Sequence, residues 1–148
     1  IVYPAVGDEK TQISVFTDAS CPYCRQLHRE VPALQKAGVT VRYIAFPRSG
    51  TRGTAYQTMR AVWCARDRRQ ALDVAKGIDQ GELGVGDCAD ADAVDAGYRL
   101  GQKVGIRGTP AVVLSDGSIQ FGYMPTSQLL ARLGLSATDG EQQSKIDP

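Results

Sequence analysis

Long apolar runs are missing from this 148-residue sequence. No stretch approaches the roughly 18 apolar residues that a membrane-spanning helix needs, so we expect no such helix. The chain also does not open with the charged and then apolar pattern of a signal peptide. It begins with Ile1 instead of Met, and we expect that an upstream segment has been removed.

An excess of charge of either sign is missing as well, since 17 Lys and Arg residues face 16 Asp and Glu residues. Recognition of nucleic acid or of an anionic membrane needs a basic surface, so we expect neither partner. The short basic run over 66–69 is interpreted as a solvated helix face. With 43% apolar residues, the chain suffices for one domain with a substantial core, but not for two.

Cysteine is scarce, and its four copies form one close pair and one distant pair. The close pair, Cys21 and Cys24, follows an apolar run and precedes a helical pattern. Residues three apart share a helix face, so these sulfurs can form a disulfide. At a helix start, free N–H groups and the helix dipole stabilise a thiolate and lower its pKa. We therefore predict redox chemistry, with Cys21 as the nucleophile and Cys24 as the resolving thiol.

The residues around this pair fit the same interpretation. Pro22 suits a first helical turn, where a missing N–H group has no cost. Tyr23 is the one aromatic residue that the motif itself places to meet a substrate. Asp18 or Ser20 is the expected helix cap. The single histidine, His28, lies on about the same helix face, where it either helps to hold a thiolate or only packs.

The distant pair, Cys64 and Cys88, has three interpretations. A second disulfide would indicate an oxidising compartment and would contribute roughly 3 to 4 kcal/mol in the chain-entropy model. Two buried free thiols are the alternative. Structural zinc is not expected, because a zinc ribbon needs a second close pair and these cysteines lie 24 positions apart.

The first half of the chain alternates strand and helix patterns. Strands over 1–6 and 11–16 flank the polar turn 7–10 and are predicted to form a hairpin. A helix over 21–36 follows, kinked at Pro32 and ended by Gly38. Residues 39–46 then predict a strand one crossover away and parallel to 11–16, which completes a β-α-β unit.

The second half is helical and then β-rich. Helices over 54–66, 70–76 and 91–103 are interpreted as an insertion over about 54–104 that covers one side of the sheet. Strands over 111–114 and 118–121 form a hairpin around Asp116 and Gly117. Thr126 is the expected cap of a closing helix that runs to Leu133. Residues 136–148 are interpreted as a flexible tail after a domain over 1–135.

Five short motifs spread along the chain carry a family resemblance. They are VFTD at 15–18, VTVRY at 39–43, FPR at 46–48, WCARD at 63–67 and GTPAVVL at 108–114. With the order of the elements, they resemble the thioredoxin fold and, more narrowly, the catalytic domain of bacterial DsbC-type periplasmic disulfide isomerases. The resemblance implies an α/β fold with a helical insertion between the β-α-β half and the C-terminal hairpin and helix.

For the site, the resemblance implies an exposed nucleophile at Cys21, a resolving thiol at Cys24 and a cis peptide between Thr109 and Pro110. A bare X-Pro bond would be expected to be trans. A proline has no N–H to donate, and its neighbouring backbone groups can pair with an extended substrate. Pro22, Tyr23, Thr109 and Pro110 are therefore the expected substrate-binding residues.

For the whole protein, the resemblance implies disulfide isomerisation of unfolded or misoxidised secreted proteins in the bacterial periplasm, with no cofactor. It also implies a DsbD-type membrane reductase as partner, and a homodimer formed through an N-terminal domain that this chain lacks. We expect a fragment that keeps its thiol chemistry and loses most isomerase and chaperone activity.

Two departures from relatives affect the expected chemistry. Thioredoxin has a buried aspartate six residues before its first cysteine, where this chain has Val15, so no carboxylate is expected there to take the proton of the resolving thiol. Asp18 is the nearest acid, with a helix cap as its expected role. The Pro22 and Tyr23 pair differs from the Gly-Tyr of the best-known isomerases, but it occurs in glutaredoxins and in DsbG-type proteins.

Two other functions remain open. One is a DsbG-like or glutaredoxin-like thiol reductase, favoured by the Cys-Pro-Tyr-Cys motif alone. The helical insertion, the second cysteine pair and Gly-Thr-Pro at 108–110 argue against a glutaredoxin, which usually has Thr-Val-Pro. The other is a peptide-binding or chaperone module with an idle cysteine pair.

Overall fold

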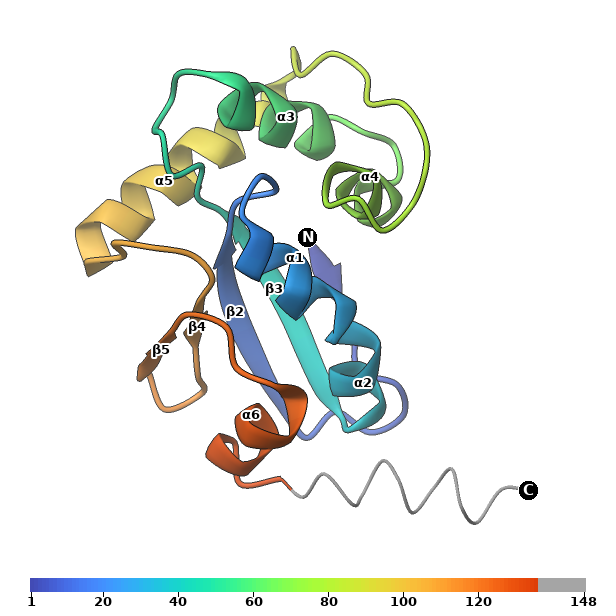
Figure 1. Cartoon of the computed structure of the whole chain (residues 1–148), viewed down its shortest axis with the longest axis vertical. Helices are drawn as coiled ribbons and strands as arrows, with labels where there is room; N and C mark the ends of the chain where they lie inside the picture. Colours follow the sequence, from blue (N-terminus) through green and yellow to red (C-terminus); the bar gives the residue numbers. More distant parts are fainter. Residues whose placement is uncertain (136–148) are drawn as a thin grey trace.

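The computed structural model describes residues 1–135, which form a mixed five-stranded sheet surrounded by helices (Figure 1). The strands are β1 (Val2–Tyr3), β2 (Thr11–Thr17), β3 (Val39–Ala45), β4 (Ala111–Val113) and β5 (Ile119–Phe121). They lie in the order β1-β3-β2-β4-β5. As predicted, β2 and β3 are parallel, and the other neighbours are antiparallel.

The predicted N-terminal hairpin is wrong. β1 pairs with β3, with Val2 opposite Arg42, and not with β2. Both edges of β2 are already occupied, one by β3 and the other by β4. The polar segment after β1 packs at the junction of α2 and β3, where the N–H of Val6 donates to the Gln35 carbonyl and the N–H of Lys10 to the Gly38 carbonyl. The outer edge of β3 is therefore the site that remains for β1.

The predicted helix over 21–36 is two helices, α1 (Pro22–Arg29) and α2 (Val31–Lys36). Pro32 stands in the first turn of α2 and cannot donate an N–H to the carbonyl of residue 28. The α-helical bonding pattern therefore ends at Glu30 instead of bending. This break places the Glu30 carboxylate against the start of α6, as described below.

The helical insertion comprises α3 (Thr54–Trp63), α4 (Arg68–Ala75), a short 3₁₀ turn (Ala89–Ala91) and α5 (Asp92–Val104). α5 packs on the face of the sheet that carries Phe16 and Phe46, where Gly101 faces the Phe46 ring. α4 lies beside α1 on the other face, with Leu72 in the same core cluster as Val15 (Figure 1). The insertion thus reaches both faces, and the prediction that it covers one side is wrong because residues 76–91 carry the chain between them.

A disulfide ties this insertion together. Cys64, which ends α3, is bonded to Cys88, which precedes the 3₁₀ turn, with their Cα atoms 5.9 Å apart. The remaining two cysteines are free thiols.

The C-terminal part contains the expected hairpin and helix. β4 and β5 pair around Asp116 and Gly117, and α6 spans Thr126–Arg132. Thr126 is not the cap that the pattern predicted, because Pro125 occupies that position. Instead the N–H and the hydroxyl of Thr126 each donate to Glu30 Oε1 at 2.9 Å. The predicted tail over 136–148 lies outside the described residues, and within 1–135 no helix is long and apolar enough to cross a membrane.

Candidate active site

Cys21 and Cys24 lie at the amino end of α1, where β2 delivers the chain. Cys21 is itself the N-cap residue, and its Sγ accepts a hydrogen bond from the Cys24 N–H at 3.4 Å. Both residues are buried, each only 1% exposed. The expectation of an exposed Cys21 is therefore wrong, because the residue is buried in the structure. Tyr23, in contrast, is 61% exposed.

Asp18 and Ser20, the predicted helix caps, do not cap α1, because Cys21 is its N-cap residue. Asp18 is buried, and its Oδ1 accepts hydrogen bonds from the Ser20 N–H at 2.8 Å and the Ser20 hydroxyl at 2.6 Å. Its Oδ2 accepts from the Arg48 N–H at 2.9 Å and from Arg48 Nε at 3.3 Å. Burial alone would raise the pKa of Asp18, but these hydrogen bonds lower it below its usual value. The ionised carboxylate of Asp18 thus stabilises the turn that leads into Cys21.

The turn before β4 lies against Cys21. Its Thr109–Pro110 peptide bond is cis, as the resemblance implied. The Cys21 thiol donates to the Thr109 carbonyl at 3.4 Å. Thr109 Oγ1 is buried and has no hydrogen-bond partner within the described part of the chain. Its hydroxyl is therefore free to donate to a sulfur that becomes a thiolate, which requires donors.

The two thiols have opposite electrostatic environments. Burial would raise the pKa of Cys21, but the hydroxyl of Thr109, the Cys24 N–H and the charge of Arg48 outweigh it and lower this pKa below its ordinary value. Burial dominates at Cys24 and raises its pKa. Cys21 is therefore the thiol that ionises first and the stronger candidate for a nucleophile.

His28 does not join this cluster. Its ring is buried, with Nδ1 2.8 Å from the Tyr43 hydroxyl and Nε2 2.6 Å from Asp73 Oδ1. Burial first, and the nearby charge of Lys76 second, lower the pKa of His28 to about 4 despite the hydrogen bond to Asp73. Within residues 1–135, no hydrogen bond joins His28 to either active-site sulfur, so a neutral imidazole in a structural network describes it best.

Sequence reasoning missed two charged residues of this region, Arg48 and Lys76. Arg48 stands in a recognised motif, but no local pattern shows that it reaches Asp18 across 30 residues of chain. Lys76 follows α4, and its side chain is fully buried with Nζ 2.8 Å from Thr17 Oγ1. A lysine four residues after the apolar Leu72 was the only signal, and it is weak because such residues are usually exposed.

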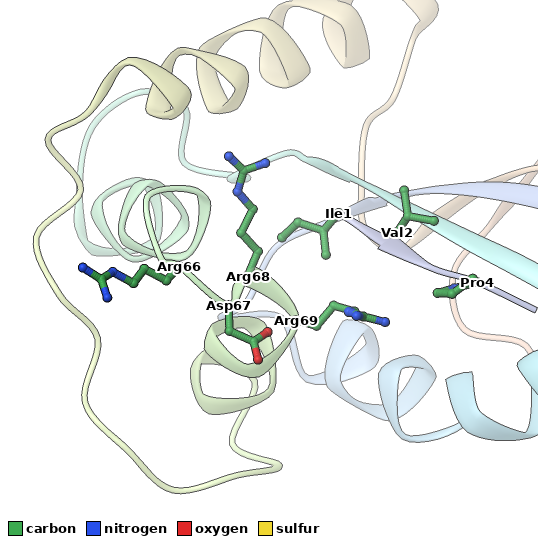
Figure 2. Close-up of a pocket in the computed structure, with 7 residues that line it drawn as sticks. All are labelled: Ile1, Val2, Pro4, Arg66, Asp67, Arg68 and Arg69. Carbon is green, nitrogen blue, oxygen red and sulfur yellow. The ribbon is translucent and has the colours of Figure 1, made fainter.

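A hollow of about 770 Å³ lies away from the cysteines, between β1 and the start of α4 (Figure 2). Its lining includes Arg66, Arg68 and Arg69, whose side chains point in three different directions (Figure 2). Arg68 is paired with Asp90 at 2.7 Å, and Asp67 caps α4 by accepting from the Gln70 N–H. The guanidinium groups do not converge on one point, so the solvated helix face remains the better interpretation.

Comparison with known proteins agrees with this geometry. A family model described as a thioredoxin-like domain matches residues 4–136. The chain is 42% identical over 134 residues to the thiol:disulfide interchange protein DsbC of Dickeya dadantii, which covers 90% of this chain and 54% of the relative. It is 43% identical over 129 residues to the Escherichia coli protein of the same name, and this alignment covers 87% of this chain and 52% of that protein. The chain thus spans about half the length of these curated relatives.

Solved structures give the same result. A disulfide interchange protein from Neisseria gonorrhoeae matches with a TM-score of 0.74 and 29% identity, over 90% of this chain and 92% of that one. The catalytic domain of Proteus mirabilis ScsC matches with a TM-score of 0.62 over 93% and 88%, and at 23% identity this likeness concerns the fold alone. The chain therefore belongs to the thioredoxin-like domain family and is similar in sequence to the DsbC thiol:disulfide interchange proteins.

Proposed function

We propose that this chain catalyses thiol–disulfide exchange with protein substrates, with Cys21 as the nucleophile and Cys24 as the resolving thiol. The observation that carries the proposal is the pair of free thiols at one helix start, where Cys21 is the N-cap and its Sγ accepts a hydrogen bond from the Cys24 N–H. The pKa of Cys21 is lowered and the pKa of Cys24 is raised, which agrees with these two roles. The thiol with the lowered pKa ionises first and can attack as a thiolate, while its neighbour remains protonated to higher pH.

In the proposed reaction, the Cys21 thiolate attacks one sulfur of a substrate disulfide. A mixed disulfide forms, and the other substrate sulfur leaves as a thiolate. If a substrate thiolate then attacks the mixed disulfide, Cys21 is released as a thiolate and the substrate disulfide has been isomerised. If the Cys24 thiolate attacks instead, Cys21 and Cys24 become a disulfide and the substrate leaves reduced.

The substrate would bind beside this pair as an extended segment. Tyr23 is exposed next to the helix start, and the Thr109 carbonyl accepts a hydrogen bond from the Cys21 thiol. These two residues, Pro22 and Pro110 are the proposed substrate contacts. Unfolded or misoxidised secreted proteins, whose chains are extended and accessible, fit such a surface.

An oxidising compartment, the bacterial periplasm, is the proposed location. The Cys64–Cys88 disulfide supports it, because such bridges persist where thiols are not kept reduced. Isomerisation there requires Cys21 and Cys24 to be kept reduced, so a DsbD-type membrane reductase is the proposed partner.

The proposed isomerase form is a homodimer made through an N-terminal domain outside this chain. The test is the refolding yield of a scrambled disulfide protein with this chain and with a fusion that adds the N-terminal portion of the Escherichia coli relative. A clear gain with the fusion is expected, and equal yields would contradict the dimer proposal.

Covalent trapping tests the exchange reaction itself. A Cys24→Ser variant should accumulate a mixed disulfide with a scrambled model protein, and Cys21→Ser should accumulate none. Reshuffling by Cys21→Ser would refute the mechanism. Turnover of a small glutathione mixed disulfide in a glutathione-coupled assay would instead favour a glutaredoxin-like reductase. Unchanged peptide affinity after alkylation of Cys21, with no trapped adduct, would favour a binding module.

A further inference from the structure

A second hollow, of about 370 Å³, lies beside the cysteine pair, between the start of α1 and the helices α3 and α4. The turn before α1 contributes Ala19 and Ser20 to its lining, so the hollow begins one residue before Cys21. Ala55 on α3 and Ala75 on α4 line it as well. These short side chains leave space for a group that a substrate brings in. The hollow therefore adjoins the place where a substrate sulfur must meet Cys21.

Among the described residues that line this hollow, Arg25 alone is charged. Its Nε donates a hydrogen bond to the Ala19 carbonyl at 3.1 Å, which holds the partly buried guanidinium at the turn before Cys21. The N–H groups on its two terminal nitrogens form no hydrogen bond within residues 1–135. No salt bridge in this part of the chain joins Arg25 to a carboxylate. The edge of a guanidinium that binds carboxylates in a bidentate manner is thus held in place and unused.

The other polar groups of the hollow also favour an anion. Three further lining residues carry a hydroxyl, namely Ser49, Thr54 and Thr58. Within residues 1–135, these hydroxyls form no hydrogen bond. The carboxylate of Asp18 does not compete for Arg25, because its two oxygens accept hydrogen bonds from Ser20 and Arg48. One cation and three hydroxyl donors are therefore available, and a carboxylate is the ligand that they match.

We propose that this hollow is a substrate subsite in which Arg25 binds the carboxylate of an aspartate or glutamate close to the substrate's reactive cysteine. The acidic residue must lie within about two positions of that cysteine, because an extended chain advances by about 3.3 Å per residue and the hollow adjoins Cys21. This inference rests on the proposed exchange function. It assigns a preferred substrate class, namely disulfides with an acidic neighbour.

The test is the rate at which Cys21 attacks short peptides whose single cysteine carries a neutral thiopyridyl group. The Cys21 thiolate attacks the peptide sulfur and a mixed disulfide forms, while the thiopyridyl sulfur leaves as a thiolate and is protonated to the absorbing thiopyridone. A Cys24→Ser background prevents resolution. The peptides differ only in Glu or Gln at one of the two positions on either side of cysteine. Each rate is divided by the rate of the same peptide with a small free thiol.

The readout is the ratio of the rates for Glu and Gln peptides, which cancels any general change at Cys21. At low salt we expect about three- to tenfold in favour of Glu at the best position, and a ratio of about one after Arg25→Gln. Arg29→Gln, which removes the same charge from the exposed last residue of α1, is the matched control and should keep the ratio. A parent ratio of about one, or equal losses in both variants, would overturn the proposal.

A filled hollow separates this subsite from a charge effect at the surface. Ala55→Leu adds volume to the lining without a change of charge, and it should also lower the ratio. A retained ratio would place the carboxylate outside the hollow and refute the subsite.

Binding can also be measured without the exchange reaction. Glu and Gln peptides with serine in place of cysteine are titrated into the Cys24→Ser chain while the Nε–H signal of Arg25 is followed by NMR. The Glu peptide should shift this signal, and the Gln peptide should not. If no peptide releases thiopyridone, the exchange function fails, while this titration still tests the subsite. Equal or absent shifts would then count against Arg25.

Discussion

Cys21 and Cys24 are three residues apart, but they differ in which element faces each sulfur. Cys21 caps α1 and lies against Thr109, with the charge of Arg48 nearby. Cys24 lies one turn deeper, where burial dominates. The motif predicts that two sulfurs meet, but the residues that lower the pKa of Cys21 include Arg48 and Thr109, which lie far away in the sequence. Only folding brings those positions to the helix start.

At the scale of single residues, replacement of His28 gives a testable prediction. His28→Gln should leave the thiolate absorbance of Cys21 against pH unchanged, because no hydrogen bond joins the ring to a sulfur. The same change should lower the free energy of unfolding by about 1 to 3 kcal/mol, since Tyr43 and Asp73 lose buried hydrogen bonds. Chemical denaturation and ultraviolet titration measure the two quantities. A shifted thiolate titration would restore His28 as a modulator of the site.

At the scale of elements, a glycine allows a helix to pack closely on a strand. In α5, a Cβ at Gly97 would collide with the backbone carbonyl oxygen of Ala45 in β3. α5 therefore packs directly on β3. This strand is the neighbour of β2, and the end of β2 leads to Cys21. The sequence pattern predicted α5 from its apolar period but gave no reason for a glycine inside it, because that reason lies in another element.

Gly97→Ala tests this contact. Alanine favours a helix over glycine by about 1 kcal/mol, so an exposed helical site would become more stable. Here we expect a net loss of about 1 to 3 kcal/mol, since the backbone of β3 must move. Gly84→Ala, in a loop where an added Cβ meets nothing, is the control and should change the unfolding free energy little. A stabilised Gly97→Ala variant would contradict the packing.

At the scale of the whole molecule, the insertion holds both the disulfide and the buried lysine. The Cys64–Cys88 bridge closes a loop across 24 positions that contains Lys76. Replacing both cysteines by alanine should lower the unfolding free energy by roughly 3 to 4 kcal/mol. Denaturation of this variant and the parent, both with Cys21 and Cys24 reduced, measures the loss. A difference below about 1 kcal/mol would mean that the bridge contributes little to stability.

The pH dependence of global stability also depends on Lys76. Its pKa is about 7 when folded and near 10.5 when unfolded, so between these values the unfolded chain binds more protons. The free energy of unfolding of the parent, relative to Lys76→Met, should therefore rise as pH increases from about 7 to 10.5, by at most several kcal/mol. Parallel urea denaturation at a series of pH values measures this. A flat difference would mean that Lys76 is not a destabilising buried cation.

Local patterns determined much of this protein. The spacing of the cysteines, the apolar period of α1 and the β-branched runs of β2 and β3 act over a few residues, so they can be interpreted without a fold. Pro32 also predicts a change in the helix at this point, but the structure has two separate helices there instead of one kinked helix. The pairing of β1 with β3 was missed, because pairing depends on which strand edges other strands leave open.

Tertiary structure alone decided the electrostatics of the site. The sequence has Val15 at the position of thioredoxin's buried aspartate. The structure places the side-chain nitrogen of Lys76 against Thr17 and Tyr43, on the face of the sheet that carries Val15. Charges act through space over distances that bear no relation to separation along the chain. The sequence therefore determined where the sulfur chemistry lies, and the fold decided which charges act on each sulfur.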